Sequence, residues 1–195
     1  MSVNNKTSEY NELVSISQSL HAECRRDNEA WEGSPFAWIK MRPSRSIGAI
    51  GEKIVASWLA MHDFNVQRSP DSEADRVVEG KRIEIKFSTL WEAGQYVFQQ
   101  IRNQNYEIIV FLGVSPNDAH CWVLPKLKVM ELWHTGVICG QHTGQGGGDT
   151  AWVHLNPSND NPYFAPYGNS LHEALNAISK LVGYVPRSIS DTINE

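Results

Sequence analysis

Residues 74–87 constrain the fold more than any other part of the chain. Two short runs, 74–78 and 82–87, are rich in β-branched and apolar residues and flank Glu79-Gly80-Lys81. A short link with glycine between two such runs is typical of a β-hairpin, because glycine adopts the positive φ angles of tight turns without strain. With the turn at this place, residues whose numbers add to about 159 face each other across the two strands.

One face of this predicted hairpin gathers charged side chains. Asp75 lies opposite Glu84, and the two-residue period of a strand places Lys86 on the same face as Glu84. Two carboxylates and one ammonium group therefore lie together on one side of the hairpin. The alternate positions are apolar and are predicted to point into a core: Ile83, Ile85 and Phe87.

Chemistry explains why such a cluster would exist. Two carboxylates directly opposite each other repel, and a hard divalent cation such as Mg²⁺ compensates them with oxygen ligands from carboxylates, water and a substrate phosphate. We expect Asp75, Glu84 and the backbone carbonyl of Ile85 to bind Mg²⁺, or Mn²⁺ in its place. Such a cation polarises a phosphodiester and helps to generate hydroxide, while Lys86 can orient or deprotonate the attacking water. The pattern thus indicates phosphodiester hydrolysis; the alternative is the solvated face of an exposed hairpin.

The surrounding sequence favours the first interpretation. The order GAIGEKIVASWLAMHDFNV, ADRVVEGKRIEIKFS and FQQIR resembles the core of the PD-(D/E)XK nuclease superfamily, which includes type II restriction endonucleases and archaeal Holliday-junction resolvases. The resemblance covers roughly residues 47–102 and the apolar run behind them. It implies the following catalytic residues: Glu52 on the preceding helix, Asp75 on the first strand, Glu84 and Lys86 of the E-x-K motif, and Gln99 or Gln100 on the next element.

Two of these assignments keep an alternative. The Pro-Asp pair of the family name occurs as Pro70-Asp71, but Asp71 precedes the strand, so the hairpin geometry favours Asp75 as the metal ligand. Gln99 and Gln100 are neighbours on a predicted strand, so only one of them is expected to face the site. The sequence does not decide which one.

The fold class expected is α/β, with a restriction-endonuclease-like core in which a central mixed β-sheet is flanked by helices. The hairpin carries the active site in this prediction, and the run 107–114 is apolar enough for a strand covered on both faces. Ser44 or Ser46 can cap the second helix, and Asn169 or Ser170 the last one. The periodicities predict helices over residues 9–31, 44–62, 125–133 and from 169 onward, and strands over 64–66, 74–78, 82–87, 96–101, 107–114, 119–124 and 151–155.

The chain is predicted to be a single nuclease domain of 195 residues in three parts. Residues 1–43 form an N-terminal helical extension, 44–124 the PD-(D/E)XK core, and 125–195 a C-terminal accessory region for DNA recognition or dimerisation. The glycine-rich segment 140–148 has no Gly-Lys-Ser/Thr, so it does not predict a nucleotide-binding loop. We expect either a mobile loop or one that closes on DNA.

Composition sets the remaining limits. The formal net charge of −5 argues against a protein that coats nucleic acid through bulk charge, although a local basic surface suffices for a nuclease. Three scattered cysteines do not form a disulfide framework, and no apolar run approaches the roughly 20 residues of a membrane span. A cytoplasmic protein without a membrane partner is expected.

The function predicted is a Mg²⁺-dependent endodeoxyribonuclease acting on double-stranded DNA, of the type II site-specific restriction kind. A homodimer and a cognate DNA methyltransferase in the same system are the partners expected. The alternatives are a structure-specific repair or recombination nuclease resembling a Holliday-junction resolvase, and a catalytically inactive DNA-binding module. Arg42, Arg45 and Lys53 near the start of the second helix are candidates for phosphate contacts, with a solvated helix start as the alternative.

Overall fold

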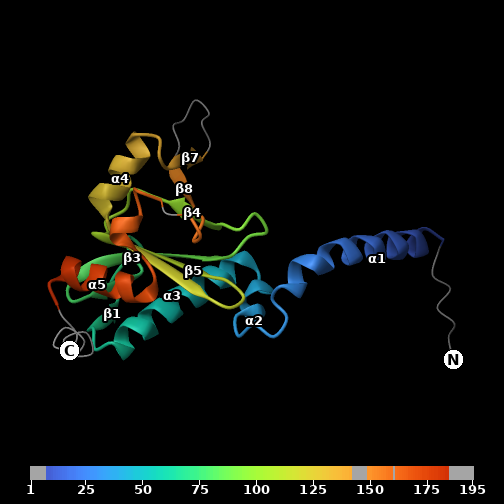
Figure 1. The fold of residues 1–195 in the computed structure, drawn as a ribbon, viewed down its shortest axis with the longest axis horizontal. Helices are drawn as coiled ribbons and strands as arrows, with labels where there is room; N and C mark the ends of the chain where they lie inside the picture. Colours follow the sequence, from blue (N-terminus) through green and yellow to red (C-terminus); the bar gives the residue numbers. More distant parts are fainter. Residues whose placement is uncertain (1–7, 142–148, 160, 185–195) are drawn as a thin grey trace.

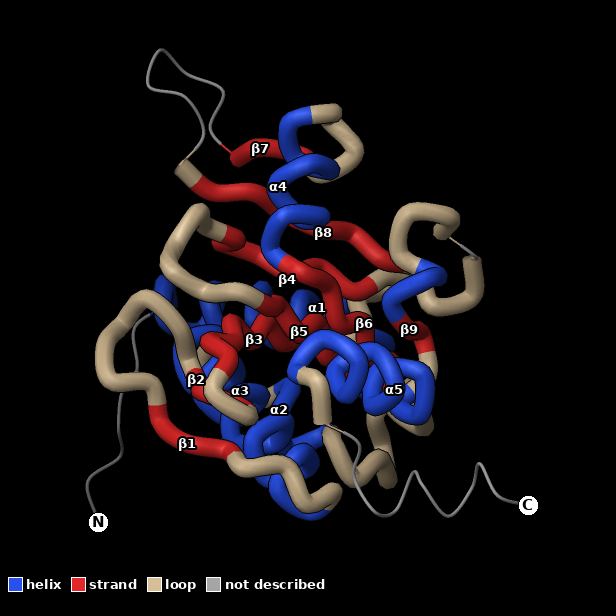
Figure 2. The backbone as a smooth tube through the Cα atoms, turned by 90° about the vertical axis from the view of Figure 1, so that its left-hand side faces the viewer, coloured by secondary structure: helices blue, strands red, loops and turns tan. Residues whose placement is uncertain are grey.

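The computed structural model describes residues 8–141, 149–159 and 161–184. Within these ranges the chain forms a mixed β-sheet with a smaller second sheet on one face and helices on the other (Figures 1 and 2). The predicted α/β class is therefore confirmed. No helix of the described residues combines the length and apolarity needed to cross a membrane.

The main sheet has six strands in the described chain, in the order β1-β2-β3-β5-β6-β9. The neighbours pair antiparallel except for β3 and β5, which run parallel. The sheet is therefore mixed, and the hairpin of β2 and β3 lies next to the edge strand β1. Its strands are β1 (Val66–Arg68), β2 (Arg76–Val78), β3 (Lys81–Thr89), β5 (Ile108–Val114), β6 (Ala119–Pro125) and β9 (Gly168–Asn169).

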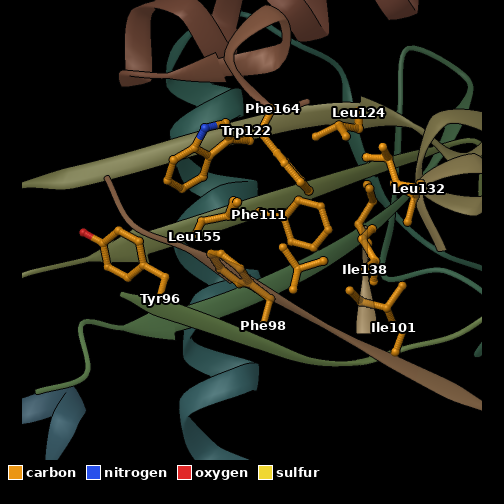
Figure 3. Close-up of a cluster of buried hydrophobic side chains, with 14 of the residues drawn as sticks. Tyr96, Phe98, Ile101, Phe111, Trp122, Leu124, Leu132, Ile138, Leu155 and Phe164 are labelled. Carbon is orange, nitrogen blue, oxygen red and sulfur yellow. The ribbon is translucent and has the colours of Figure 1, made fainter. Parts of the chain in front are cut away.

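The second sheet has the order β4-β8-β7 and packs with helix α4 over one face of the main sheet (Figure 2). Aromatic side chains fill the space between them: Phe98 lies against Phe111, with ring centroids 5.0 Å apart, and both are fully buried (Figure 3). The sequence did not predict that residues 96–101 leave the main sheet. The elements of this layer are β4 (Tyr96–Ile101), β7 (Cys139–Gln141), β8 (Thr150–Leu155) and α4 (Lys126–His134).

Helices α3 (Ser44–Met61) and α5 (Leu171–Val182) cover the other face of the main sheet. Val55 and Leu59 of α3 and Ile178 of α5 are buried there against the apolar side of β3 and β5. Every residue of β5 is buried, as expected for a strand with a core on both sides. Ser170 caps α5 in a capping box with Glu173, which confirms one of its two predicted caps.

Helix α1 (Ser8–Glu29) extends away from the rest of the chain, and α2 (Ala37–Lys40) connects it to α3 (Figure 1). The predicted N-terminal helix is thus confirmed. Its apolar residues Leu13, Ile16 and Leu20 are exposed, however, at 65%, 56% and 53%. This apolar stripe does not contribute to the core of this chain.

Two local predictions differ from the structure. Pro43 is the N-cap of α3 and no side chain caps the helix, so neither Ser44 nor Ser46 has that role; Ser44 is already the first helical residue. The edge strand begins at Val66, two residues later than predicted, because the backbone N–H of Phe64 donates to the carbonyl of Leu59 and closes the end of α3.

Candidate active site

The turn between β2 and β3 determines which residues of the hairpin face each other. Glu79 and Gly80 both have positive φ angles, 48° and 80°, as a tight two-residue hairpin turn requires. The register pairs Arg76 with Ile83 and Val78 with Lys81. Asp75 precedes the paired residues of β2, so its place directly opposite Glu84 stays a prediction from the sequence.

Asp75 lies directly before β2, which begins at Arg76. Beyond this point β3 has no paired strand on the β2 side in the described chain. Its backbone N–H donates to the carbonyl of Ile83 at 3.0 Å. Its carboxylate Oδ2 accepts a hydrogen bond from the backbone N–H of Ile85 at 2.7 Å. The N–H and the carbonyl of one strand residue point to the same side, so the carbonyl of Ile85 also faces this open edge.

Glu84 and Lys86 form an ion pair on the face of β3 that points away from α3. The Nζ of Lys86 lies 2.7 Å from Oε1 of Glu84, and Glu84 is only 7% exposed. Burial raises the pKa of Glu84; the charge of Lys86 opposes this rise, while the carboxylates of Asp75 and Glu52 add to it. The site is therefore one in which negative charge is crowded and only partly compensated.

Glu52 reaches the same region from α3. Gly51 lets the helix approach β3 closely, since a Cβ atom built on Gly51 would lie 2.2 Å from Cβ of Phe87. Glu52 is next along the helix, and its pKa is raised by burial first and by the carboxylate of Asp75 second. Arg76 partly offsets this, with Nη1 at 3.6 Å from Oε2 of Glu52.

These groups line one cleft of about 520 Å³. Arg45 at the start of α3 and Trp91 in the β3–β4 loop also line it, and Trp91 is 47% exposed. The sequence-predicted residues that the structure brings together here are Glu52, Asp75, Glu84, Ile85, Lys86, Gln99, Gln100 and Arg45.

The expectation that only one of Gln99 and Gln100 faces the site is wrong. Both are exposed and both line the cleft. The pairing of β4 with β8 shifts between Phe98 and Ile101, and Gln100 has a φ of 55°. This bulge breaks the two-residue alternation on which the expectation rested.

Three other candidates lie outside the cleft. Asp71 is ion-paired with Arg82 at the surface and does not line the cleft, so the structure favours Asp75 over it. Arg42 lies over the ring of Trp38, 5.8 Å from its centroid. Lys53 lines an adjacent hollow instead.

Ser88 lines the cleft but was not singled out from the sequence. Its Oγ accepts a hydrogen bond from the backbone N–H of Val97 at 3.0 Å and so joins β3 to the start of β4, the strand that carries the two glutamines. Strand parity could have found it, because Ser88 continues the series of Glu84 and Lys86.

The donor set fits Mg²⁺ better than zinc. Among the described residues no group of three or more His, Cys, Asp or Glu side chains lies close enough to hold a metal by itself. Two carboxylates and a backbone carbonyl at an open edge match the way Mg²⁺ binds, since Mg²⁺ keeps several waters and takes few protein ligands. Zinc, by contrast, needs three or four nitrogen, sulfur or carboxylate ligands from the protein.

Comparisons with known proteins identify no family. No family model matches the chain, and no curated protein is similar to it in sequence. One solved structure similar to this fold is that of a bacterial homing endonuclease, I-Ssp6803I, with 15% identity and a TM-score of 0.48, over 73% of this chain and 96% of that chain. This likeness is too distant to assign an activity.

Proposed function

We propose that the protein is a metal-dependent endodeoxyribonuclease that hydrolyses phosphodiester bonds in double-stranded DNA. The observation that carries the proposal is the meeting of Asp75, Glu84 and Lys86 in one cleft. Asp75 is held by the N–H of Ile85, and Glu84 is held by the Nζ of Lys86. Buried Glu84 and half-buried Asp75 make the cleft a receptor for a cation, and the exposed amides of two glutamines supply hydrogen-bond donors for an anionic substrate.

Asp75, Glu84 and the carbonyl of Ile85 would hold Mg²⁺, which supplies charge for a phosphodiester and acidifies a bound water. Lys86 would then turn from Glu84 towards the attacking water and orient it as an ammonium group. To act as the base it would first release a proton to solvent; the neutral amine would then take the proton of the water, and the ammonium group so formed would offset the charge that develops on the phosphate. Gln99 and Gln100 would orient the phosphate or the water through their amide groups. Glu52 would complete the negative wall of the cleft.

The finer assignment that we propose is a type II restriction endonuclease acting as a homodimer. The described part of the chain carries one set of these reactive groups, so breaking both strands of a duplex at one place calls for two copies related by symmetry. The elements outside residues 44–124, including α1 and the strands β7 and β8, offer surface for base contacts and for a dimer interface. A DNA methyltransferase would be the natural partner in such a system.

Incubation of the pure protein with plasmid and phage DNA, with and without Mg²⁺, tests this function. Discrete fragments support a site-specific restriction enzyme. Cutting only of branched or flapped DNA would move the assignment to a repair or recombination nuclease. No cutting of any DNA with Mg²⁺ or Mn²⁺ would overturn the enzyme and leave a DNA-binding module.

A further inference from the structure

A second hollow adjoins the cleft on the side of the edge strand β1. It has a volume of about 460 Å³ and is lined by Ala49, Glu52, Lys53, Arg68 and Arg76. Glu52 lines both the hollow and the cleft, so the two share a wall. Figure 2 shows the elements concerned, α3, β1 and β2, side by side at one edge of the main sheet.

Positive charge is concentrated in this hollow, although repulsion between the charges reduces the stability of the β1–β2 pairing. Arg68 and Arg76 are direct partners in the antiparallel register of β1 and β2. Like charges directly opposite each other on a strand pair repel and destabilise the pairing. Lys53 brings a third cation from α3, while Glu52 is the single acid among the described residues that line the hollow.

The Arg76 guanidinium is held in place and not fully neutralised. Its Nη1 donates to the backbone carbonyl of Asp75 at 2.6 Å, which ties it to a residue that lines the cleft. The same Nη1 lies 3.6 Å from Oε2 of Glu52, which is beyond a hydrogen bond. Glu52 also faces the charges of Lys86 and Arg68, so its one charge is shared among several cations.

We propose that Lys53, Arg68 and Arg76 form a phosphate subsite for the backbone of the DNA strand that enters the cleft. This inference rests on the proposed function. A strand whose scissile phosphate lies at Asp75 and Glu84 would continue past Glu52 and place a neighbouring phosphate against the three cations. Lys53 was a sequence candidate for such contacts, whereas Arg68 and Arg76 were not.

The hollow is suited to a polymer more than to a single small anion. Its cations come from three elements, and Lys53 and Arg68 are exposed to solvent. A lone phosphate in such a place gains little against water and salt, whereas a chain of phosphates gains from the release of its counterions. The group recognised is a phosphate oxyanion in both cases, and the test below separates inorganic phosphate from the phosphates of DNA.

The test measures binding without cutting. Fluorescence anisotropy with a labelled DNA duplex is recorded in EDTA over a series of salt concentrations, for the wild type, Arg68→Gln and Lys53→Gln. Each substitution is expected to weaken binding about 5- to 10-fold and to reduce the slope of log K against log salt by about 1. The matched control is Lys180→Gln, an exposed cation on α5 that lines neither hollow, and its affinity and slope should equal those of the wild type.

The outcomes separate this proposal from the proposed function. Unchanged affinity and slope in Arg68→Gln and Lys53→Gln would overturn the subsite, even if the wild type cuts DNA with Mg²⁺. Reduced affinity and slope would support the subsite, even if no DNA is cut. Competition by inorganic phosphate at constant ionic strength, without any effect of the substitutions on the duplex, would assign the hollow to a small anion and overturn a DNA subsite. Circular dichroism of both variants checks that they are folded.

Discussion

The carboxylate of Asp75 accepts a hydrogen bond from the backbone N–H of Ile85, 2.7 Å away, across the hairpin that the two strands form. This bond takes the place of a ladder bond that β2 would make if it began earlier. It leaves a carboxylate oxygen and the carbonyl of Ile85 together at an open strand edge, beside the buried Glu84. The site therefore exists because one strand of the hairpin stops short.

Mg²⁺ should stabilise the folded protein through these oxygens. At concentrations about tenfold above its dissociation constant, a ligand that binds only the folded state adds about 1.4 kcal/mol, which corresponds to a rise in melting temperature of about 3 °C for a chain of this size. Differential scanning fluorimetry should show this rise for the wild type and lose it in Asp75→Asn. An equal rise in both proteins would place the cation elsewhere.

Lys86 is expected to be needed for catalysis and not for folding. Lys86→Gln removes the ammonium group beside Glu84 and should reduce the cleavage rate by about 10²- to 10⁴-fold, the usual range for a proton-transfer residue. Lys81 on the same strand provides the matched control, because it pairs with Glu107 outside the cleft, with Nζ 2.8 Å from Oε1. Lys81→Gln should cut within about twofold of the wild type, since exposed ion pairs contribute little. Equal losses in both variants would point to a general effect of charge on DNA binding.

Two glycines of α3 should respond in opposite ways to alanine. Gly51→Ala would force Cβ against Phe87 and should cost about 1–3 kcal/mol in the free energy of unfolding. Gly48 has no atom within 4 Å of a built Cβ, so Gly48→Ala should leave the stability unchanged or raise it by up to about 1 kcal/mol. Urea denaturation followed by tryptophan fluorescence measures both. A neutral Gly51→Ala would mean that α3 does not rest on β3 as closely as the structure has it.

Ionised Glu52 should destabilise the metal-free protein at neutral pH. Burial raises the pKa of Glu52 in the folded state. The favourable contribution of this carboxyl group to the free energy of unfolding is therefore complete below its pKa in the unfolded chain, and it is lost as pH rises through its pKa in the folded chain. Glu52→Gln should therefore melt at a higher temperature than the wild type at pH 7 in EDTA, and the difference should vanish below about pH 4.

Glu173 offers a control of opposite sign. Hydrogen bonds from the backbone and side chain of Ser170 lower the pKa of Glu173. The contribution of Glu173 to the free energy of unfolding is therefore present at neutral pH, and it is lost as pH falls through its pKa in the folded chain. Glu173→Gln should melt lower than the wild type at neutral pH and approach it in acid. If both variants shift in the same direction at pH 7, the raised pKa of Glu52 is not the cause.

The sequence predicts the site best where a local rule determines the geometry. Glu79 and Gly80 form the turn, and the turn determines the register of β2 and β3. Asp75, directly before β2, is then close enough to bond to Ile83 and Ile85 of β3. Strand parity then places Lys86 beside Glu84. None of these steps depends on distant parts of the chain, so each could be taken from residues 74–87 alone.

Prediction failed where tertiary packing overrides the local period. The bulge at Gln100 puts two neighbouring glutamines on one side, and nothing in the residues FQQI distinguishes it from a regular strand. The pairing of Arg68 with Arg76 could not be predicted either, because β1 and β2 are joined by seven residues without a regular pattern. The second sheet depends on β8 meeting β4 from about 50 residues away, a pairing that local periodicity cannot predict.

The most direct test of the proposed active site compares Asp75→Asn with Asp71→Asn in the cleavage of duplex DNA. Both variants lose one negative charge from the same short stretch, but only Asp75 lines the cleft, whereas Asp71 is paired with Arg82 at the surface. With Mg²⁺ and enzyme in excess over plasmid, Asp75→Asn should cut at least about 10³-fold more slowly than the wild type, while Asp71→Asn should stay within about twofold. Full activity in Asp75→Asn, or its loss in Asp71→Asn alone, would contradict the proposed active site.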